Sequence, residues 1–331
     1  MTVSIRPAEI SDLEMVADLL IQDAEQRHAG NQRLWPLDAN AHQKTRSTLK
    51  HAMEDDHPPF RQQWLLAEDG GDIVGVSHTI LLPVPPIYAG EFGPPGLIME
   101  DCFVVENAPK GTRAALIKAA EADLIAAGAQ ILLASSVPGG ALETTYASQG
   151  YAPLTLYFAK VGLAKGKPFD DVRRATEKDI PAIVASSADH RRILHTINTF
   201  WKPHAEADAR FGNWMTRSLT LTDRDMFVSE TEGVFEGYAI SQPATPLHFP
   251  TPHDISRIGI IDDFYHADFE DPDTLAGAGH SARAMLQAAE AAREVRDDAA
   301  VLVICPAAWP SKGALLRSAG YENAITWFIK R

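Results

Sequence analysis

A polar turn between a strand-like run and a helix-like run holds the residues best suited to bind an anion. The run DCFVV is followed by the turn ENAPKGT and then by a long alanine-rich stretch. A helix that begins near Thr112 presents free backbone N–H groups and the positive end of its dipole, which suits a diphosphate. Gly111 lets the backbone approach a ligand closely, and Lys110 and Arg113 add positive charge. The alternative is an ordinary strand–helix connection with two surface cations.

The elements around this turn follow from residue periodicity. The apolar residues Leu116, Ala120, Leu124 and Ala127 recur at helical spacing and form one stripe, which predicts an amphipathic helix packed on a core. Gly128 suits the left-handed position that follows a helix C-terminus. The run LIMEDCFVV before the turn has the character of a buried strand, so the turn joins a strand to a helix.

The composition is that of a soluble globular protein of about two domains. The chain has 331 residues, of which 45% are hydrophobic and 22% charged, and its formal net charge is −14. This charge argues against a nucleic-acid or membrane partner, because both need concentrated Lys and Arg. The two cysteines, Cys102 and Cys305, lie in apolar runs and are predicted to be buried thiols. We find no metal-ligand spacing, signal peptide or membrane span, and we expect a cytoplasmic protein.

The chain repeats itself once. The opening SIRPAEISDL resembles DVRRATEKDI from Asp171, and the hairpin WLLAEDGGDIVGV resembles MFVSETEGVFEGY. Each half then has a proline-rich loop, a strand with two acidic residues, and a closing G-Y followed by an aromatic strand. The offsets stay nearly constant: 237 − 75 = 162 for the hairpin glycine, 263 − 101 = 162 for the aspartate, and 320 − 150 = 170 for the G-Y glycine. We therefore predict a tandem duplication with its boundary between Gly162 and Asp171.

This order of elements resembles the GNAT acyltransferase superfamily, in which an acyl-CoA gives its acyl group to an amine. The matching motifs are IRPAxxxDL, the hairpin that ends in V-G, the strand–turn–helix after Glu100, and YASQGY from Tyr146. The family pattern Q/R-x-x-G-x-G/A in the turn is met here by APKGTR, which keeps only the first glycine. The resemblance implies an α/β fold of two tandem GNAT-like acyl-CoA acyltransferase domains, each a mixed, mostly antiparallel twisted sheet flanked by helices. Residues 1–163 would be the CoA-binding, catalytic domain, and residues 170–331 a degenerate one.

The resemblance also implies which residues hold acetyl-CoA as cosubstrate. A splayed strand supplies backbone groups to the pantetheine arm, and the turn with the first helical residues receives the diphosphate. Carried onto this sequence, the positions are Cys102, Phe103, Val104, Val105, Lys110, Gly111, Thr112, Arg113 and Ala114. In the second half, the register of the following helix aligns His280 with Gly111, and nearby acidic residues would repel a diphosphate.

Catalytic roles follow from the same resemblance. Tyr146 matches the tyrosine that protonates the leaving thiolate, with a core tyrosine as the alternative. Glu100 and Asp101 are the candidates for the general base, although only one of two successive strand residues faces the cleft. They are echoed by Asp262 and Asp263 in the second half, so a structural role is equally open. Trp35 lies between helices that cover the acceptor site in the family, which makes it a candidate for substrate binding.

The predicted function is therefore acyl-CoA-dependent N-acyltransfer, in which an acetyl or other acyl group passes directly from the CoA thioester to the amine of a small molecule. The expected enzyme is an N-acetyltransferase, an acyltransferase that transfers groups other than aminoacyl groups. No metal is expected. One alternative is a pseudoenzyme that binds acyl-CoA without chemistry, favoured by the reduced glycine motif; another is a structural tandem that binds none. The chain is expected to be a monomer whose halves imitate a dimer, or a homodimer.

Overall fold

The computed structural model describes residues 3–55, 58–163 and 171–331. The first half contains β1 (Ser4–Pro7), α1 (Leu13–Gly30), α2 (Ala41–Glu54), β2 (Gln62–Asp69), β3 (Asp72–Leu81), β4 (Gly96–Ile98), β5 (Phe103–Val104), α3 (Thr112–Ala126), β6 (Leu132–Ser136), α4 (Ala141–Ser148) and β7 (Ala152–Val161). The second contains β8 (Val172–Arg174), α5 (Ile180–Ile197), α6 (Ala207–Ser218), β9 (Asp225–Thr231), β10 (Val234–Pro243), β11 (Ile258–His266), α7 (His280–Val295), β12 (Ala300–Pro306), α8 (Pro310–Ser318) and β13 (Glu322–Lys330). Most of the predicted linker, residues 164–170, lies outside the described residues.

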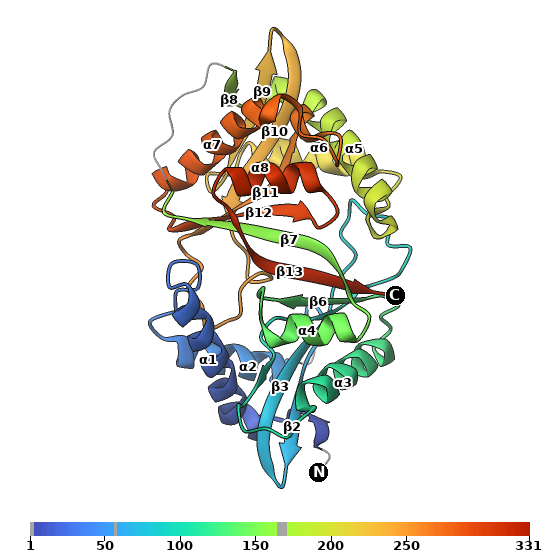
Figure 1. The fold of residues 1–331 in the computed structure, drawn as a ribbon, viewed down its shortest axis with the longest axis vertical. Helices are drawn as coiled ribbons and strands as arrows, with labels where there is room; N and C mark the ends of the chain where they lie inside the picture. Colours follow the sequence, from blue (N-terminus) through green and yellow to red (C-terminus); the bar gives the residue numbers. More distant parts are fainter. Residues whose placement is uncertain (1–2, 56–57, 164–170) are drawn as a thin grey trace.

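The strands form one continuous sheet that runs through both halves. The strand order is β1-β2-β3-β4-β6-β13-β7-β12-β11-β10-β9-β8, and β5 pairs with β3 at the side of this path. Figure 1 shows the early strands of each half at opposite ends of an elongated molecule, with β6, β13, β7 and β12 crossing its middle. The sheet is mixed, because β4–β6 and β11–β12 pair in parallel and the other pairs are antiparallel.

The two halves exchange their closing strands. β7, the last strand of the first half, pairs with β13 on one side and β12 on the other, both from the second half. Within the described part of the chain, β13, the last strand of the second half, pairs with β6 and β7 of the first and with no strand of its own half. Each half thus supplies the other with a strand that its own sheet lacks. The repeat predicted from the sequence is present in the order of elements, whereas the two sequence halves do not form two separate sheets.

The repeated opening motif has the same structural cause in both halves. Arg6 donates two hydrogen bonds to Asp12, at 2.6 and 2.8 Å, and Arg173 donates two to Asp179, at 2.8 Å each. Each pair ties the first strand of its half to the start of the first long helix. Bidentate pairing of this kind fixes geometry as well as charge, which explains why the arginine and aspartate recur at matched positions.

The strand predicted from Leu97 to Val105 is interrupted. β4 pairs with β6 in parallel as far as Ile98, and β5 pairs with β3 alone. The four residues in between, from Met99 to Cys102, are in neither strand. The prediction of one strand was wrong here because the two ends of the segment follow different neighbours. In the second half, β11 is continuous, but it pairs with β12 only from Ile258 to Ile261.

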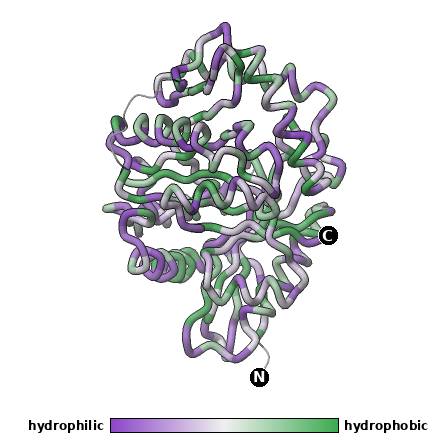
Figure 2. The backbone as a smooth tube through the Cα atoms, turned by 45° about the horizontal axis from the view of Figure 1, so that its top comes forward, coloured by the Kyte–Doolittle hydropathy of each residue, from purple (hydrophilic) through white to green (hydrophobic). Residues whose placement is uncertain are grey.

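Apolar residues concentrate on this sheet and on the helix faces that cover it. Figure 2 shows the hydrophobic segments along the crossing strands in the middle of the molecule and hydrophilic ones on the outer helices and turns. Cys102 and Cys305 are both buried free thiols, as predicted. Within the described ranges, no helix is long and apolar enough to cross a membrane.

Candidate active site

The N-terminus of α3 has the geometry expected for the anion site. Gly111 is the N-cap residue with φ 93°, a left-handed conformation that favours glycine, and nothing lies within 4 Å of the place a Cβ would take. The Thr112 side chain donates to the carbonyl of Pro109 at 2.7 Å and so holds the turn. Among the described residues, the backbone N–H groups of Arg113 and Ala114 have no acceptor. These donors, with exposed Lys110 beside them, are available to a ligand.

The matching turn in the second half is already used by the protein. Gly277, Ala278 and Gly279 are all left-handed, and Gly279 is the N-cap of α7, which begins at His280. The alignment of His280 with Gly111 was therefore wrong, since Gly279 holds the position of Gly111. The carboxylate of Asp268 accepts a hydrogen bond from the backbone N–H of Ala282 at 2.9 Å. An internal negative charge thus lies at this helix terminus, and it would repel a second anion.

The break between β4 and β5 opens the sheet next to this helix terminus. β6 stays with β4 up to Ile98 and then separates from the chain that continues into β5. Of the predicted pantetheine-binding residues, Phe103 and Val104 form β5, and Val105 donates its N–H to Val74 at 3.0 Å. Cys102 is in no strand, and its thiol is buried, 3.1 Å from the Met99 carbonyl and 3.2 Å from the Ser77 hydroxyl.

Buried polar atoms without partners gather at this break. Both carboxylate oxygens of Glu100, the hydroxyl of Ser135 on β6 and the hydroxyl of Tyr146 on α4 make no hydrogen bond with any residue that the structure describes. Ser135 and Glu100 are close enough for the hydroxyl to lower the carboxyl pKa, although their geometry is not that of a hydrogen bond. Orphaned polar groups are rare in protein interiors, and they mark places where a ligand or water completes the structure.

Glu100 and Asp101 occupy different environments, which separates the two candidates for the base. Burial raises the pKa of Glu100 to about 7, while the charge of Arg27 acts in the opposite direction. Burial also acts on Asp101, but the charge and hydrogen bond of His78 outweigh it and leave the pKa of Asp101 below its usual range. His78 Nδ1 is 3.1 Å from the Asp101 carboxylate. Asp101 is therefore a paired, ionised group, and Glu100 is an unpaired one that titrates near neutral pH.

Three residues that the sequence did not single out hold this pair in place. Arg27, 7% exposed on α1, donates to the backbone carbonyl of Glu100 and to the carboxylate of Asp23. His78, on β3, stacks on Trp64 with ring centroids 4.3 Å apart. The spacing of Asp23 and Arg27, four residues apart on one helix, is a signal that could have indicated an ion pair. Nothing local in the sequence connects His78 to Asp101.

Tyr146 is completely buried at the same place. Burial raises its pKa well above the ordinary value, and the nearby Cys102 thiol is the next contribution. The ring packs against Tyr151 at 5.2 Å and against Phe328 of β13 at 5.6 Å. Because β13 belongs to the second half, the surroundings of Tyr146 are complete only when both halves are present.

Trp35 lies in contact with the second half. Its ring centroid is 5.0 Å from that of Phe249 and 5.3 Å from that of His253, and the Arg27 guanidinium lies 5.6 Å above it. The segment after it is fixed by hydrogen bonds to the second half, such as Lys44 Nζ to the His253 carbonyl at 2.8 Å. The structure thus places Trp35 next to the Glu100 environment through Arg27, and its role in substrate binding stays a prediction.

The corresponding opening in the second half is filled by a side chain. Lys312 on α8 is 2% exposed and donates to the carbonyl of Phe264 at 2.7 Å, beyond the point where β11 leaves β12. Its ammonium lies 5.4–5.8 Å from the rings of Phe264, Phe269 and Trp309. Asp263, the counterpart of Asp101, accepts hydrogen bonds from Tyr238 at 2.8 Å and His190 at 3.2 Å. In the second half Lys312 therefore fills the opening, and Asp263, like Asp101, is a paired carboxylate.

Comparison with known proteins identifies the fold. No protein-family model matches the chain, and no curated protein matches it in sequence. A tandem GNAT protein from the clavulanic acid biosynthesis pathway is 12% identical, with 99% of this chain and 98% of that chain covered and a TM-score of 0.51. A GCN5-related N-acetyltransferase from Sphaerobacter thermophilus is 14% identical, with 99% and 95% covered and a TM-score of 0.58. The chain therefore has the tandem GNAT fold, as the sequence motifs indicated, and these identities support no finer statement.

Among the described residues, no group of three or more His, Cys, Asp or Glu side chains is placed to hold a metal ion.

Proposed function

We propose that the chain is an acyl-CoA-dependent N-acyltransferase whose active site lies in the first half. The observation that carries the proposal is the group of unpartnered buried polar atoms on Glu100, Ser135 and Tyr146 beside the open N-terminus of α3. Acyl transfer needs both an anion site for the donor and proton-transfer groups near the thioester. The tandem GNAT fold supports the same reaction class.

The residues that would hold acetyl-CoA follow from the α3 terminus and the strand break. The free N–H groups of Arg113 and Ala114, with the cations of Lys110 and Arg113, suit the diphosphate. The open space around Gly111 allows the phosphates to approach the backbone. The edge of β5 that faces away from β3 would accept the pantetheine arm, because no other strand in the described ranges pairs with it.

Glu100 and Tyr146 would carry the two proton transfers. Glu100, with a pKa of about 7, accepts the proton that the acceptor amine loses, and the amine nitrogen forms a bond to the thioester carbon. The bond from that carbon to sulfur breaks, and the thiolate of CoA takes a proton from the Tyr146 hydroxyl. The Tyr146 hydroxyl is protonated at neutral pH, as in any tyrosine, and burial raises its pKa further. Asp101 and Arg27 position Glu100 rather than react.

Calorimetric titration with acetyl-CoA tests the donor site. We expect one equivalent to bind to the wild-type chain and at least a hundredfold loss of affinity in Gly111→Trp, because the indole would fill the space next to the free N–H groups. Gly128→Trp is the matched control: it lies just past the other end of α3, also has a positive φ, of 102°, and has nothing within 4 Å of its Cβ position. Gly128 lies at the C-terminal end of α3, where the helix dipole is negative and does not favour phosphate binding.

The outcome decides between the halves. If wild type and Gly111→Trp bind acetyl-CoA equally, the donor site lies in the second half. The argument that the Asp268 carboxylate repels an anion there would then be wrong. If neither binds any CoA compound, the N-acyltransferase proposal fails. If wild type binds and Gly111→Trp does not, release of CoA thiol with a panel of small amines, run beside Tyr146→Phe, tests the transfer step.

A pseudoenzyme that binds acyl-CoA without transfer is the second candidate. It is favoured by the burial of the proposed reactive groups, since Glu100 is 1% exposed and Tyr146 is not exposed at all. An acceptor amine reaches Glu100 only if neighbouring segments move. Acetyl-CoA binding together with no thiol release across primary and secondary amines, from about pH 6 to pH 9, would favour this candidate.

A further inference from the structure

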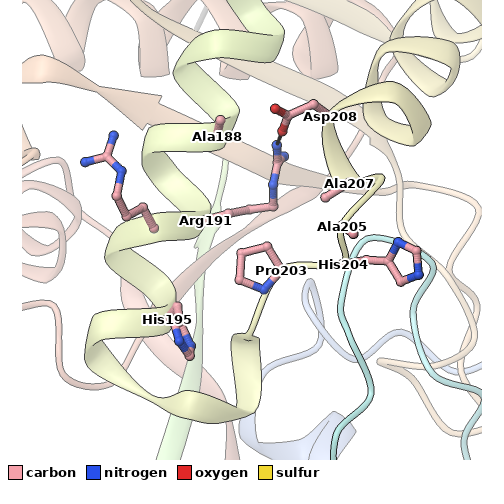
Figure 3. A pocket seen from close by; sticks show the side chains of 9 residues that line it. Ala188, Arg191, His195, Pro203, His204, Ala205, Ala207 and Asp208 are labelled. Atoms are coloured by element: carbon pink, nitrogen blue, oxygen red, sulfur yellow. Dashed lines mark hydrogen bonds and ion pairs between the residues drawn. The ribbon is translucent and has the colours of Figure 1, made fainter.

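The second half contains a pocket that plays no part in the proposed transfer reaction. It has a volume of about 300 Å³ and lies between α5 and the segment that leads into α6. Figure 3 shows Arg191 and His195 on the α5 side, with Pro203, Ala205, Ala207 and Asp208 across from them. A volume of this size is at the lower end for ligand pockets, and it is enough for roughly ten water-sized groups.

The polar lining of the pocket is mainly basic, in a chain whose net charge is −14. Besides Asp208, the polar residues are Arg191, Arg192, His195 and His204, and Arg192 also pairs with Asp189 one turn earlier on α5. Arg191 is 3% exposed, so its guanidinium is fixed in the wall, and its charge is less screened than that of a surface arginine. The rest of the lining consists of Pro203 and three alanines.

Arg191 already holds a carboxylate that a ligand can replace. Its Nη1 donates to Ser187, and its Nη2 donates to Asp208 at 2.6 Å. The Asp208 side chain is 66% exposed, and its other carboxylate oxygen accepts no hydrogen bond from the described residues. Because Asp208 stays largely hydrated without this contact, it is a weak competitor for the buried guanidinium.

Two histidines supply further polar groups. His204 Nδ1 accepts a hydrogen bond from the backbone N–H of Glu206 at 3.0 Å, so the neutral ring carries its proton on Nε2 and can donate it. His195 Nδ1 is buried and has no partner among the described residues. This atom is shielded from the pocket, so of the two rings it is His204, through Nε2, that offers a donor to a ligand.

The first half of the chain fixes the wall of the pocket. Tyr88 forms a β-bridge with Pro203, and His204 donates its N–H to the Ile87 carbonyl at 2.9 Å. Arg210 donates to the Pro86 carbonyl at 2.8 Å. The segment that carries Pro203 and His204 is thus held by the first half, and the pocket is formed before any ligand arrives, which lowers the cost of binding.

We propose that this pocket binds a small organic carboxylate with a compact apolar body. The carboxylate replaces Asp208 on Arg191, with Arg192 adding positive charge, and the apolar part lies against Ala188, Pro203 and Ala205. A small inorganic anion would use the arginine but leave the apolar wall unfilled. This site is independent of acyl-CoA and of the first-half residues that the proposed transfer reaction uses.

Ligand-observed fluorine NMR with the full chain tests this directly. The probe is 4-fluorobenzoate, and 4-fluorobenzylamine has a similar size and the opposite charge. We expect saturable binding of the carboxylate and no saturable binding of the amine. Equal binding of both would overturn the proposal, because it would show that the pocket selects an aromatic ring without regard to charge.

Two substitutions have opposite expected effects. Asp208→Asn removes the competing charge but keeps an acceptor for Arg191, and it should tighten 4-fluorobenzoate binding about two- to fivefold. Arg192→Gln should weaken binding by at least a similar factor. The matched controls are Asp72→Asn, at the exposed start of β3, and Arg217→Gln, exposed on α6, which change the net charge equally away from the pocket.

The controls separate a site from a general effect of charge. If Asp72→Asn tightens binding as much as Asp208→Asn, or Arg217→Gln weakens it as much as Arg192→Gln, the anion responds to the net charge and the proposal is wrong. Unchanged or weaker binding in Asp208→Asn would also overturn it, since Arg191 would then not be the group that receives the carboxylate.

Discussion

Replacing Glu100 by glutamine should make the protein more stable at alkaline pH and inactive in acyl transfer. Burial raises the pKa of Glu100 from 4.5 to about 7, so the folded protein binds a proton that the unfolded chain has released between these two values. Stability therefore falls as the pH rises through this range. A shift of this size corresponds to about 3 kcal/mol of unfolding free energy. Glutamine has the same shape and no charge, so it avoids this loss.

Urea unfolding at about pH 5 and about pH 8.5 measures the effect. We expect Glu100→Gln and wild type to agree within roughly 1 kcal/mol at the lower pH, and the variant to be more stable by up to about 3 kcal/mol at the higher pH. Asp101→Asn is the matched comparison with the opposite sign. The pKa of Asp101 is lowered below 3.8, so its stabilisation is lost only at more acidic pH, and its replacement should destabilise the protein at both pH values.

The catalytic prediction uses the same pKa. The kcat/KM of the wild type should rise with pH up to about 7 and then level off, and Glu100→Gln should lower it by roughly 10²–10⁴-fold and remove this pH dependence. A variant that is destabilised equally at both pH values would show that Glu100 makes a structural bond, and the assignment as base would fail. A variant that is more stable than wild type but fully active would show that Glu100 is an unpaired buried acid with no role in acyl transfer.

Three further predictions concern other parts of the molecule. Tyr146→Phe should leave acetyl-CoA affinity unchanged and lower kcat by about 10²-fold if the hydroxyl protonates the thiolate; an unchanged kcat would leave Tyr146 as a core residue. Asp268→Ala should cost about 0.5–2 kcal/mol in urea unfolding without changing the number of acetyl-CoA molecules bound, because Lys312 still fills the second-half opening; a second bound equivalent would show that Asp268 alone keeps an anion from the α7 terminus. A chain of residues 1–163 should not be a folded monomer, because both described partners of β7, the strands β12 and β13, belong to the second half; a monomer with cooperative unfolding in analytical ultracentrifugation and urea titration would refute this.

Much of the local structure could be predicted from the sequence. The periodicity of Leu116, Ala120 and Leu124, with Gly128 after them, indicated a helix that the structure confirms as α3, from Thr112 to Ala126. The repeated motifs indicated a duplicated α/β unit, and the tandem GNAT fold bears this out. These features depend on neighbours in sequence, through helix periodicity, turn chemistry and capping, so the sequence is sufficient to indicate them.

The candidate site was predictable only in part. The residues of the α3 terminus were named from the turn that contains Gly111, whereas Arg27, Asp23, His78 and Ser135 were not. His78 meets Asp101 only because β3 pairs with the chain on both sides of the strand break. The sequence also left open which of Glu100 and Asp101 is paired. That distinction depends on burial and on partners more than twenty residues away.

The sequence by itself determined the elements, their order, the duplication and the turn that suits an anion. Only the tertiary structure decided how the halves combine and which of two similar turns is free. The exchange of β7 and β13 depends on pairing between residues more than 160 positions apart, such as Glu322 with Ala159. Likewise, Asp268 and Lys312 use the second-half site because folding brings them to Ala282 and Phe264. Contacts of this kind come from packing in three dimensions, which local periodicity does not encode.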